Sequence, residues 1–336
     1  MYKIAVIGYG YWGPNIVRNF NNHPLCEVSY ICDIDAKNKS RARKEYPHKL
    51  IIDDPEIIFN DNNIDVVAIV TPVSTHYTLA KKTLLSGKHL FIEKPMVESV
   101  IKAKELIDLA NQNKLIAVVD HTFLFTDAIV KIKEIIDSGE IGEISYFDST
   151  RVNLGNFQHD VDVIWDLAPH DLSILFYLSN QKPKDIIASG TDHLNNGLVD
   201  IAYLTLSYDS KMIANFHLNW LSPIKIRRII IGGTKKMILF DDLKVTEKIK
   251  IYDKGIDIIE DQDEIHNLLI NYRSGDVISP NISNSEALKV EINEFINHID
   301  SKSNVLLKND LTHGRKVVEI LEAAKKSLNS NKRISI

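Results

Sequence analysis

Three closely spaced glycines constrain the fold of this chain more than any other feature. The run Gly8-Tyr9-Gly10-Tyr11-Trp12-Gly13 directly follows an apolar segment, Lys3–Ile7, and opens a helical stretch. Gly8 permits a tight turn, Gly10 lets the backbone approach a pyrophosphate, and Gly13 allows a helix to pack closely on a strand. The free N–H groups and the dipole at the start of that helix favour an anion. The motif predicts a strand–turn–helix unit that holds a dinucleotide.

A carboxylate in the expected place strengthens this prediction. Asp33 ends the second apolar segment, Glu27–Cys32, near the usual ~20-residue offset for the group that binds the ribose hydroxyls. A glycine turn without a ligand is the alternative, and Asp33 argues against it. The carboxylate would also repel a 2′-phosphate, so the sequence favours NAD over NADP. Arg41 and Arg43 lie further along and weaken that preference.

The first 120 or so residues alternate short apolar segments with helical ones. The apolar segments are rich in β-branched residues and nearly continuous, as in parallel strands that are buried on both faces. They are Lys3–Ile7, Glu27–Cys32, Lys49–Ile52, Asp65–Val70, His89–Ile92 and Ile116–Val119. Repeated β-α-β units of this kind predict an α/β fold with a doubly wound parallel sheet, a Rossmann domain.

The pattern changes after about residue 122. Two helices, about Asp127–Ser138 and Val163–Leu178, are followed by segments in which polar and apolar residues alternate, which predicts a mainly antiparallel sheet in an α+β domain. Residues 253–284 are polar and weakly patterned, which suggests a long loop with short strands. A chain of 336 residues is expected to form two domains, here 1–122 and 123–336, with the C-terminal helix possible on either one.

Composition excludes several classes of partner. The chain has 40 Lys and Arg against 45 Asp and Glu and lacks a basic run, which argues against nucleic acid. No apolar stretch reaches the roughly 18–20 residues of a membrane span, and Met1–Gly8 does not resemble a signal peptide. The only two cysteines, Cys26 and Cys32, do not make a disulfide framework or a zinc site. We therefore expect a cytoplasmic protein.

Three further motifs carry a family resemblance. Thr71-Pro72-Val73-Ser74-Thr75-His76 and Glu93-Lys94-Pro95 follow the fourth and fifth strands, and Asp166-Leu167-Ala168-Pro169-His170 lies in the second domain. With the glycine motif, the chain resembles the Gfo/Idh/MocA family (glucose–fructose oxidoreductase and inositol dehydrogenase) over essentially its whole length. The resemblance implies a Rossmann domain followed by a substrate-binding domain whose open sheet often mediates oligomerisation, hence a homodimer or homotetramer.

The resemblance also assigns residues to sites. It implies that Lys94, Asp166 and His170 line the active site and that the Lys94–Pro95 bond is cis. The residues expected to contact the cofactor are Gly8, Gly10, Tyr11, Trp12, Gly13, Asp33, Thr71, Pro72, His76, Glu93 and Lys94.

The chemistry of these side chains suits hydride transfer at a carbinol carbon. Lys94 precedes a proline and is held extended, and its ammonium can stabilise alkoxide charge. Asp166 and His170 are four residues apart and share a helix face. The imidazole can take a hydroxyl proton, while Asp166 orients it or binds a second hydroxyl. The sequence leaves open whether Lys94 or His170 is the principal acid/base, and whether the helical pair is merely structural.

A metal site is the main alternative reading of the second domain. Asp162, Asp166 and His170, with His159 and Asp160, bring carboxylates and imidazoles together in sequence. No cysteine contributes, and the spacing matches no known site, so we expect no metal.

The expected substrate is a sugar, bound by His121, Arg151, Asn153, Asp166 and His170. The family often has an Asn-Arg pair after the last Rossmann strand, where this chain has His121-Thr122. The runs Thr150–Gly155 and Trp165–Asp171 resemble members that act at C3 of nucleotide-linked sugars, and Arg151 would pair with a substrate carboxylate or phosphate. A dehydrogenase of a free polyol such as inositol or glucose, a non-catalytic dinucleotide sensor, and a scaffolding protein remain alternatives.

Overall fold

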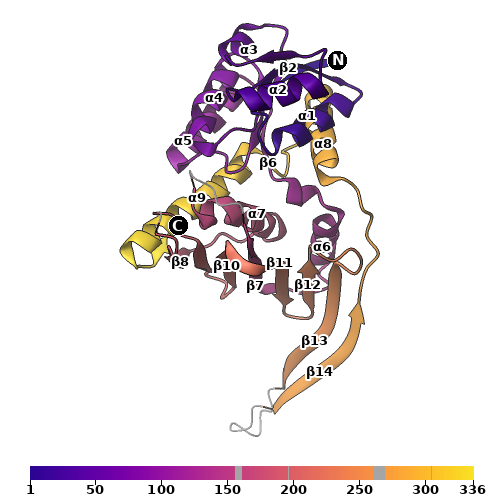
Figure 1. Ribbon diagram of the computed structural model, residues 1–336. Helices are drawn as coiled ribbons and strands as arrows, with labels where there is room; N and C mark the ends of the chain where they lie inside the picture. Colours follow the sequence, from indigo (N-terminus) through magenta and orange to yellow (C-terminus); the bar gives the residue numbers. More distant parts are fainter. Residues whose placement is uncertain (156–160, 196, 260–268, 304) are drawn as a thin grey trace. The chain divides into compact units, whose positions relative to one another are not determined.

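The structure is a computed structural model that describes residues 1–155, 161–195, 197–259, 269–303 and 305–336 (Figure 1). The chain divides into two compact units. The first comprises residues 1–126 and 285–322, and the second comprises residues 127–284 and 323–336. The boundary expected from the sequence was residue 122, and the expected second domain included residues 285–322, with the C-terminal helix allowed to pack back on the first domain.

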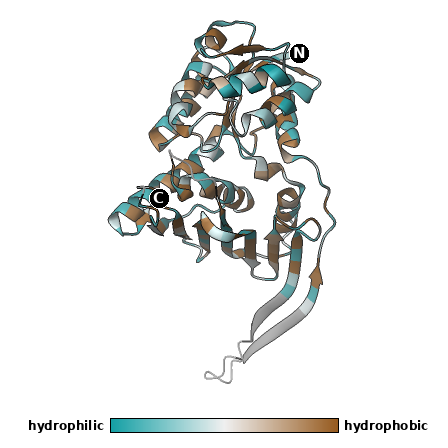
Figure 2. Cartoon of the chain, viewed as in Figure 1, coloured by the Kyte–Doolittle hydropathy of each residue, from teal (hydrophilic) through white to brown (hydrophobic). Residues whose placement is uncertain are grey.

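A six-stranded parallel sheet forms the centre of the first unit, as predicted. Its strand order, β3-β2-β1-β4-β5-β6, is that of a doubly wound dinucleotide-binding fold. The strands are β1 Tyr2–Ile7, β2 Cys26–Cys32, β3 Leu50–Ile52, β4 Val66–Ile69, β5 His89–Glu93 and β6 Ala117–Asp120. Every residue of β4 and β6 is buried, and the apolar character of these strands is plain in Figure 2. Burial on both faces explains why the strands have continuous apolar sequences.

Helices cover both faces of this sheet. Figure 1 shows α1 and α8 on one side and α4 and α5 on the other. The helical segments of the unit are α1 Gly13–Asn22, α2 Ala36–Glu45, α3 Glu56–Asn60, α4 Val73–Leu85, α5 Val100–Gln112, η1 Thr122–Phe125, α8 Ala287–Ser301 and the first part of α9 Leu311–Ser330.

Aromatic contacts attach α8 to the first unit. Phe91 of β5 packs edge-to-face against Phe20 of α1 at 5.6 Å and against Phe295 of α8 at 5.7 Å, measured between ring centroids. The apolar stripe of α8 belongs to the same buried cluster. This stripe was visible in the sequence, but the surface that buries it was not. Its burial here is the reason why residues 285–322 belong to the first unit.

The second unit is built on a nine-stranded, mainly antiparallel sheet of order β14-β13-β12-β11-β7-β10-β9-β8-β15. Figure 1 shows α6 Asp127–Asp137 and α7 Val163–Leu178 over one face. Along β9 and β10 buried and more exposed residues alternate, which is the pattern that predicted one covered face. The strands are β7 Ile144–Leu154, β8 Asp185–Thr191, β9 Ile201–Ser207, β10 Ile213–Asn219, β11 Leu221–Gly233, β12 Met237–Asp241, β13 Ile249–Ile259, β14 Leu269–Ile278 and β15 Ile334–Ser335.

The prediction of a loop with short strands over 253–284 is wrong for most of the described residues there. β13 and β14 are long strands that pair antiparallel with each other. Polar residues such as Asp253 and Lys254 hid this pairing from the sequence analysis, because a two-stranded ribbon is joined by backbone hydrogen bonds and needs no continuous apolar pattern. Residues 260–268 lie outside the described part of the chain. No described helix is long and apolar enough to cross a membrane.

A buried ion pair joins β7 to α7. The guanidinium of Arg151 donates to the carboxylate of Asp171 through Nε at 2.9 Å and Nη2 at 2.6 Å, and Ser149 Oγ donates to the same carboxylate at 2.7 Å. Both charged side chains are almost completely buried. A charge removed from water in this way needs a partner inside the protein. Arg151 therefore has a carboxylate partner within the chain, which the sequence analysis had sought in the substrate.

We predict that Asp171→Ala lowers the free energy of unfolding by about 3–5 kcal/mol, because it leaves the Arg151 charge buried without its carboxylate. The matched control is Glu134→Ala on α6, which breaks an exposed pair with Lys131 and should cost less than about 1 kcal/mol. Urea unfolding of both variants measures the difference. Equal small losses would show that the buried pair does not stabilise the second unit.

Candidate cofactor and active-site residues

The glycine turn lies at the carboxyl end of β1, where the backbone is packed too closely for side chains. Gly8 has φ +103°, and a Cβ atom there would lie 2.2 Å from the carbonyl oxygen of Val70. A Cβ atom on Gly13 would lie 2.4 Å from the carbonyl oxygen of Gly8. Apart from residues 9–11 themselves, no described residue has an atom within 4 Å of the corresponding position on Gly10. Gly8 and Gly13 thus serve the fold, whereas Gly10 leaves a space beside the backbone.

Asp33 ties the end of β2 to this turn. Its carboxylate accepts hydrogen bonds from Tyr9 N at 2.7 Å, Asp35 N at 2.7 Å and Asn38 Nδ2 at 3.1 Å. These donors fix the orientation of the carboxylate beside the turn. The location is the one expected for a group that binds ribose hydroxyls.

Arg41 is committed to the turn as well. Its guanidinium donates to the carbonyl oxygens of Tyr9 and Gly10, the latter at 2.6 Å, and lies 4.9 Å from the centroid of the Tyr9 ring. A guanidinium held in this way is less available to a 2′-phosphate. Arg41 therefore weakens the preference for NAD over NADP less than its place in the sequence suggested.

His76 joins the ends of β4 and β5. Its ring lies between two carbonyl oxygens, with Nδ1 2.9 Å from Pro95 O and Nε2 2.7 Å from Thr71 O. Burial lowers the pKa of His76, although the carbonyl groups oppose that effect, so a neutral ring donates to one of the two. The side chain is buried, and its visible role is to hold the strand ends rather than to reach a ligand.

The Lys94–Pro95 peptide bond is cis, as the resemblance implied. Lys94 follows β5 at the carboxyl end of the parallel sheet, and its backbone N–H donates to the carboxylate of Glu93. Thr71 and Pro72 follow β4 at the same edge. Ligands of open α/β sheets bind outside this edge. The structure therefore brings Lys94 and the predicted cofactor residues to the ligand-binding end of one sheet.

His121 is more deeply buried than a substrate-contacting residue requires. It is 2% exposed, and neither ring nitrogen has a hydrogen-bond partner among the residues described. Its ring packs edge-to-face on that of His313 at 5.4 Å between centroids. Burial, His313 and Lys94 hold the pKa of His121 well below its usual range, so the ring is neutral.

In the second unit, Asp166 and His170 lie on α7, as predicted. The helix is capped by Asp162, whose side chain accepts from Ile164 N and Trp165 N at 3.0 Å each. Asp166 accepts a hydrogen bond at 3.1 Å from Nε1 of Trp220, which orients its carboxylate. Asn153 is partly buried near the end of β7.

The metal alternative gains nothing from the described residues, in which no group of three or more His, Cys, Asp or Glu could hold an ion. His159 and Asp160 lie outside the described residues.

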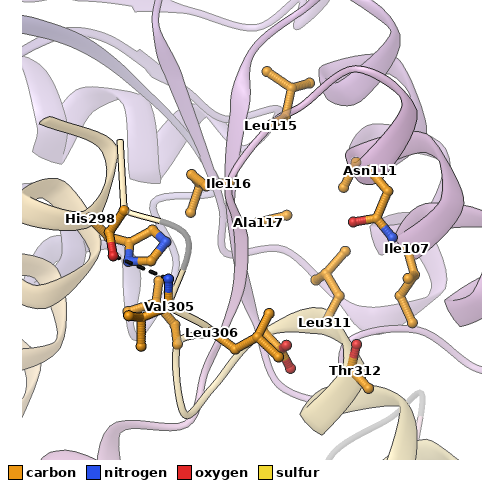
Figure 3. Close-up of a pocket in the computed structure, with 14 residues that line it drawn as sticks. Ile107, Asn111, Leu115, Ile116, Ala117, His298, Val305, Leu306, Leu311 and Thr312 are labelled. Carbon is orange, nitrogen blue, oxygen red and sulfur yellow. Dashed lines mark hydrogen bonds between the residues drawn. The ribbon is translucent and has the colours of Figure 1, made fainter. Parts of the chain in front are cut away.

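A pocket of the first unit lies at the other end of β6. Figure 3 shows this cavity of about 310 Å³ beside Ile107 of α5, Leu115 and Ile116, and the exposed Val305 and Leu306. Residues 115–117 enter β6, whereas the candidate residues lie where the strands end. We assign this pocket no part in the chemistry.

Comparisons with known proteins agree with this arrangement. A family model described as "Oxidoreductase family, NAD-binding Rossmann fold" matches residues 2–121, and the GFO/IDH/MocA C-terminal domain matches residues 129–239. The chain belongs to the Gfo/Idh/MocA family. It is an oxidoreductase with an NAD-binding Rossmann domain.

Two curated relatives and one solved structure show the range of the family. UDP-N-acetylglucosamine 3-dehydrogenase of Acidithiobacillus ferrooxidans is 25% identical over 94% of both chains. The scyllo-inositol 2-dehydrogenase (NAD(+)) of Bacillus subtilis is 28% identical over 77% of this chain and 80% of its own. GenD2 from gentamicin A biosynthesis, solved with NAD, has a TM-score of 0.82 and 16% identity over 100% of this chain and 96% of that one.

Sequence reasoning missed one buried acid near the site, Glu291 of α8. Its carboxyl group accepts hydrogen bonds from His121 N at 3.1 Å and Asn309 Nδ2 at 2.8 Å. A signal was present, because Glu291 lies between Leu288 and Ile292 on the apolar stripe of its helix. A lone acid on a buried helix face calls for a partner elsewhere in the fold.

We predict that Gly10→Ala weakens NAD binding at least ~tenfold while leaving the thermal unfolding of the unliganded protein unchanged, because the added methyl group meets only the ligand. Calorimetric titration with NAD and a thermal scan measure the two effects. Gly13→Ala is the contrasting variant, since its methyl group meets backbone and lowers stability itself. NAD binding by Gly10→Ala with wild-type affinity would contradict the assignment of the turn.

Proposed function

We propose that this protein transfers a hydride between NAD and a carbinol or keto carbon, C3, of a nucleotide-linked sugar. The observation that supports this most is the 25% identity over 94% of both chains to a UDP-N-acetylglucosamine 3-dehydrogenase. This chain also has the side chains that such a reaction needs, in Lys94 and in the Asp166–His170 pair.

The residues of the glycine turn suit the cofactor. In this proposal the pyrophosphate lies beside Gly10, against the N-terminus of α1, where N–H groups and the helix dipole favour its charge. Tyr11 and Trp12 complete the turn, and Asp33 binds the adenosine ribose. Thr71, Pro72 and Glu93 border the remainder of the cofactor at the strand ends. When bound, NAD accepts the hydride.

Lys94 acts on the reacting oxygen in this proposal. Its ammonium donates a hydrogen bond to the substrate hydroxyl and stabilises the negative charge that develops as the hydride leaves. The hydrogen bond from its backbone N–H to Glu93 holds its backbone at the sheet edge.

His170 takes the hydroxyl proton, or receives it through Lys94, and Asp166 binds a neighbouring hydroxyl or orients the imidazole. The indole of Trp220 fixes the Asp166 carboxylate for either role. Arg151 acts through Asp171, which immediately follows His170, and so positions α7 rather than a substrate phosphate. Asn153 remains a proposed contributor to substrate recognition, whereas the burial of His121 argues against a direct contact with the substrate.

A free polyol is the second candidate substrate. The relative that favours it is the scyllo-inositol 2-dehydrogenase, at 28% identity over 77% of this chain. The same side chains serve both substrates, because each presents a secondary hydroxyl with hydroxyl neighbours. A non-catalytic dinucleotide sensor is disfavoured, because a sensor needs no acid/base group and this chain has Lys94, Asp166 and His170.

The outer face of the nine-stranded sheet supports a proposed homodimer or homotetramer. Ile187, Tyr203 and Ile213 are exposed on β8, β9 and β10. Apolar and aromatic side chains of this kind are common where copies of a chain meet. We also propose a cytoplasmic location, which is consistent with the free thiols of Cys26 and Cys32.

A substrate panel tests the proposed reaction. We expect NADH formation from NAD with a UDP- or dTDP-hexose at a kcat/KM at least ~tenfold above that with scyllo-inositol, myo-inositol or glucose. A substrate deuterated at C3 should transfer its label to NADH. Turnover of the free polyols alone would reject the nucleotide-linked sugar, and absence of turnover with every substrate would favour the sensor.

A further inference from the structure

α8 carries a buried acid, Glu291, near the end of β6. Glu291 is 0% exposed, and its Oε1 accepts from His121 N and Asn309 Nδ2. Its other oxygen, Oε2, has no N–H or hydroxyl donor among the described residues. An ionised carboxylate in this position would have one oxygen uncompensated in an apolar core, which is costly. The geometry suits a protonated carboxylic acid.

We assign Asp120 as the acceptor for this proton. Asp120 directly precedes His121, whose backbone N–H donates to Glu291 Oε1 at 3.1 Å, so the two carboxyl groups lie close together. Two carboxyl groups can share a hydrogen bond only when one of them carries a proton. Burial and the charge of Asp120, with a smaller effect of Glu93, raise the pKa of Glu291 well above its usual range. Glu291 is therefore the member of the pair that holds the proton.

Asp120 is also hydrogen-bonded to the glycine turn. Its Oδ2 accepts a hydrogen bond at 2.9 Å from Nε1 of Trp12, and its Oδ1 accepts from Thr122 N at 3.2 Å. Trp12 is the residue immediately before α1, so its backbone forms the end of the glycine turn. Hydrogen bonds thus connect α8 to the end of β6, and the end of β6 to the start of α1.

We propose that Glu291 is a positioning residue for the cofactor: with Asp120 it anchors Trp12, and so fixes the end of α1 that receives the pyrophosphate of NAD. The inference rests on the proposed place of the pyrophosphate at the glycine turn. It assigns α8 a part in cofactor affinity, although α8 lies far along the chain from the glycine motif.

Among the charged groups around Glu291, Glu291 itself is the one whose ionisation would disturb the hydrogen bond between Asp120 and Trp12. Asp120 and Glu93 face it from the ends of β6 and β5, and His121 stays neutral next to His313 and Lys94. Two further pairs of charged groups are compensated: Arg18 of α1 pairs with Glu286, and Lys308 pairs with Glu294 of α8.

The sign of the pH effect follows from the raised pKa. Below it, Glu291 is neutral and supports Asp120; as the pH rises through it, two carboxylates oppose each other and Asp120 is repelled from its place beside Trp12. Affinity for NAD is therefore full at the lower pH and falls as Glu291 ionises.

The test is calorimetric titration with NAD from mildly acidic to alkaline pH. In the wild type the Kd should rise up to ~tenfold per pH unit above the raised pKa. Glu291→Gln should keep the neutral-pH Kd within about twofold and lose this dependence, because an amide donates to Asp120 without titrating. Trp12→Phe, which lacks the indole N–H, should bind NAD several-fold to ~tenfold more weakly at every pH.

Glu294→Gln on the same helix is the matched control and should keep the wild-type pH profile. An alkaline loss of affinity in Glu291→Gln equal to that of the wild type would overturn the inference, as would wild-type affinity in Trp12→Phe. If Glu291→Gln does not fold, the wild-type titration still decides, because a Kd that stays constant into the alkaline range would contradict the role of Glu291. Gly10→Ala separates the two claims, because normal NAD binding by that variant would refute the cofactor site itself.

Discussion

The close approach of backbone to backbone at the glycine turn is the constraint on which the rest of the first unit depends. Side chains at Gly8 and Gly13 would collide with the carbonyl oxygens of Val70 and Gly8. Their absence lets β1, β4 and the start of α1 meet at one edge of the sheet. Asp33 and Arg41 then hold the turn from the side of β2 and α2. The NAD-binding property of the family follows from this local geometry.

Buried polar side chains organise the same edge of the sheet. His76 bridges the ends of β4 and β5, and Asp120 receives the indole of Trp12. Glu291 takes part from α8, which is brought there by the packing of Phe295 on Phe91. Protonation removes the cost of burying a second carboxylate beside Asp120. In the second unit the charge of a buried carboxylate is balanced differently. There Asp171 forms a buried ion pair with Arg151.

Sequence patterns predicted what local chemistry determines and missed what distant segments determine. The parallel strands, the glycine turn and the bounds of α7 followed from short motifs and periodicity, and the cis Lys94–Pro95 bond followed from the family resemblance. The placement of α8 did not, because an apolar stripe does not identify the surface that buries it. Arg151 was expected to meet a substrate anion for a similar reason: its partner Asp171 lies 20 positions away, and only the fold brings them together.

We conclude that the turn binds NAD, and we propose that Lys94 acts on the bound substrate. The decisive measurement compares turnover and NAD affinity of Lys94→Ala on the same preparation. We expect a kcat lower by ~100-fold or more with a Kd for NAD within about threefold of the wild type. Lys102→Ala, which removes a half-buried lysine paired with Glu98 on α5, should leave both unchanged. Undiminished turnover in Lys94→Ala, or equal loss of NAD binding and turnover, would contradict this proposal.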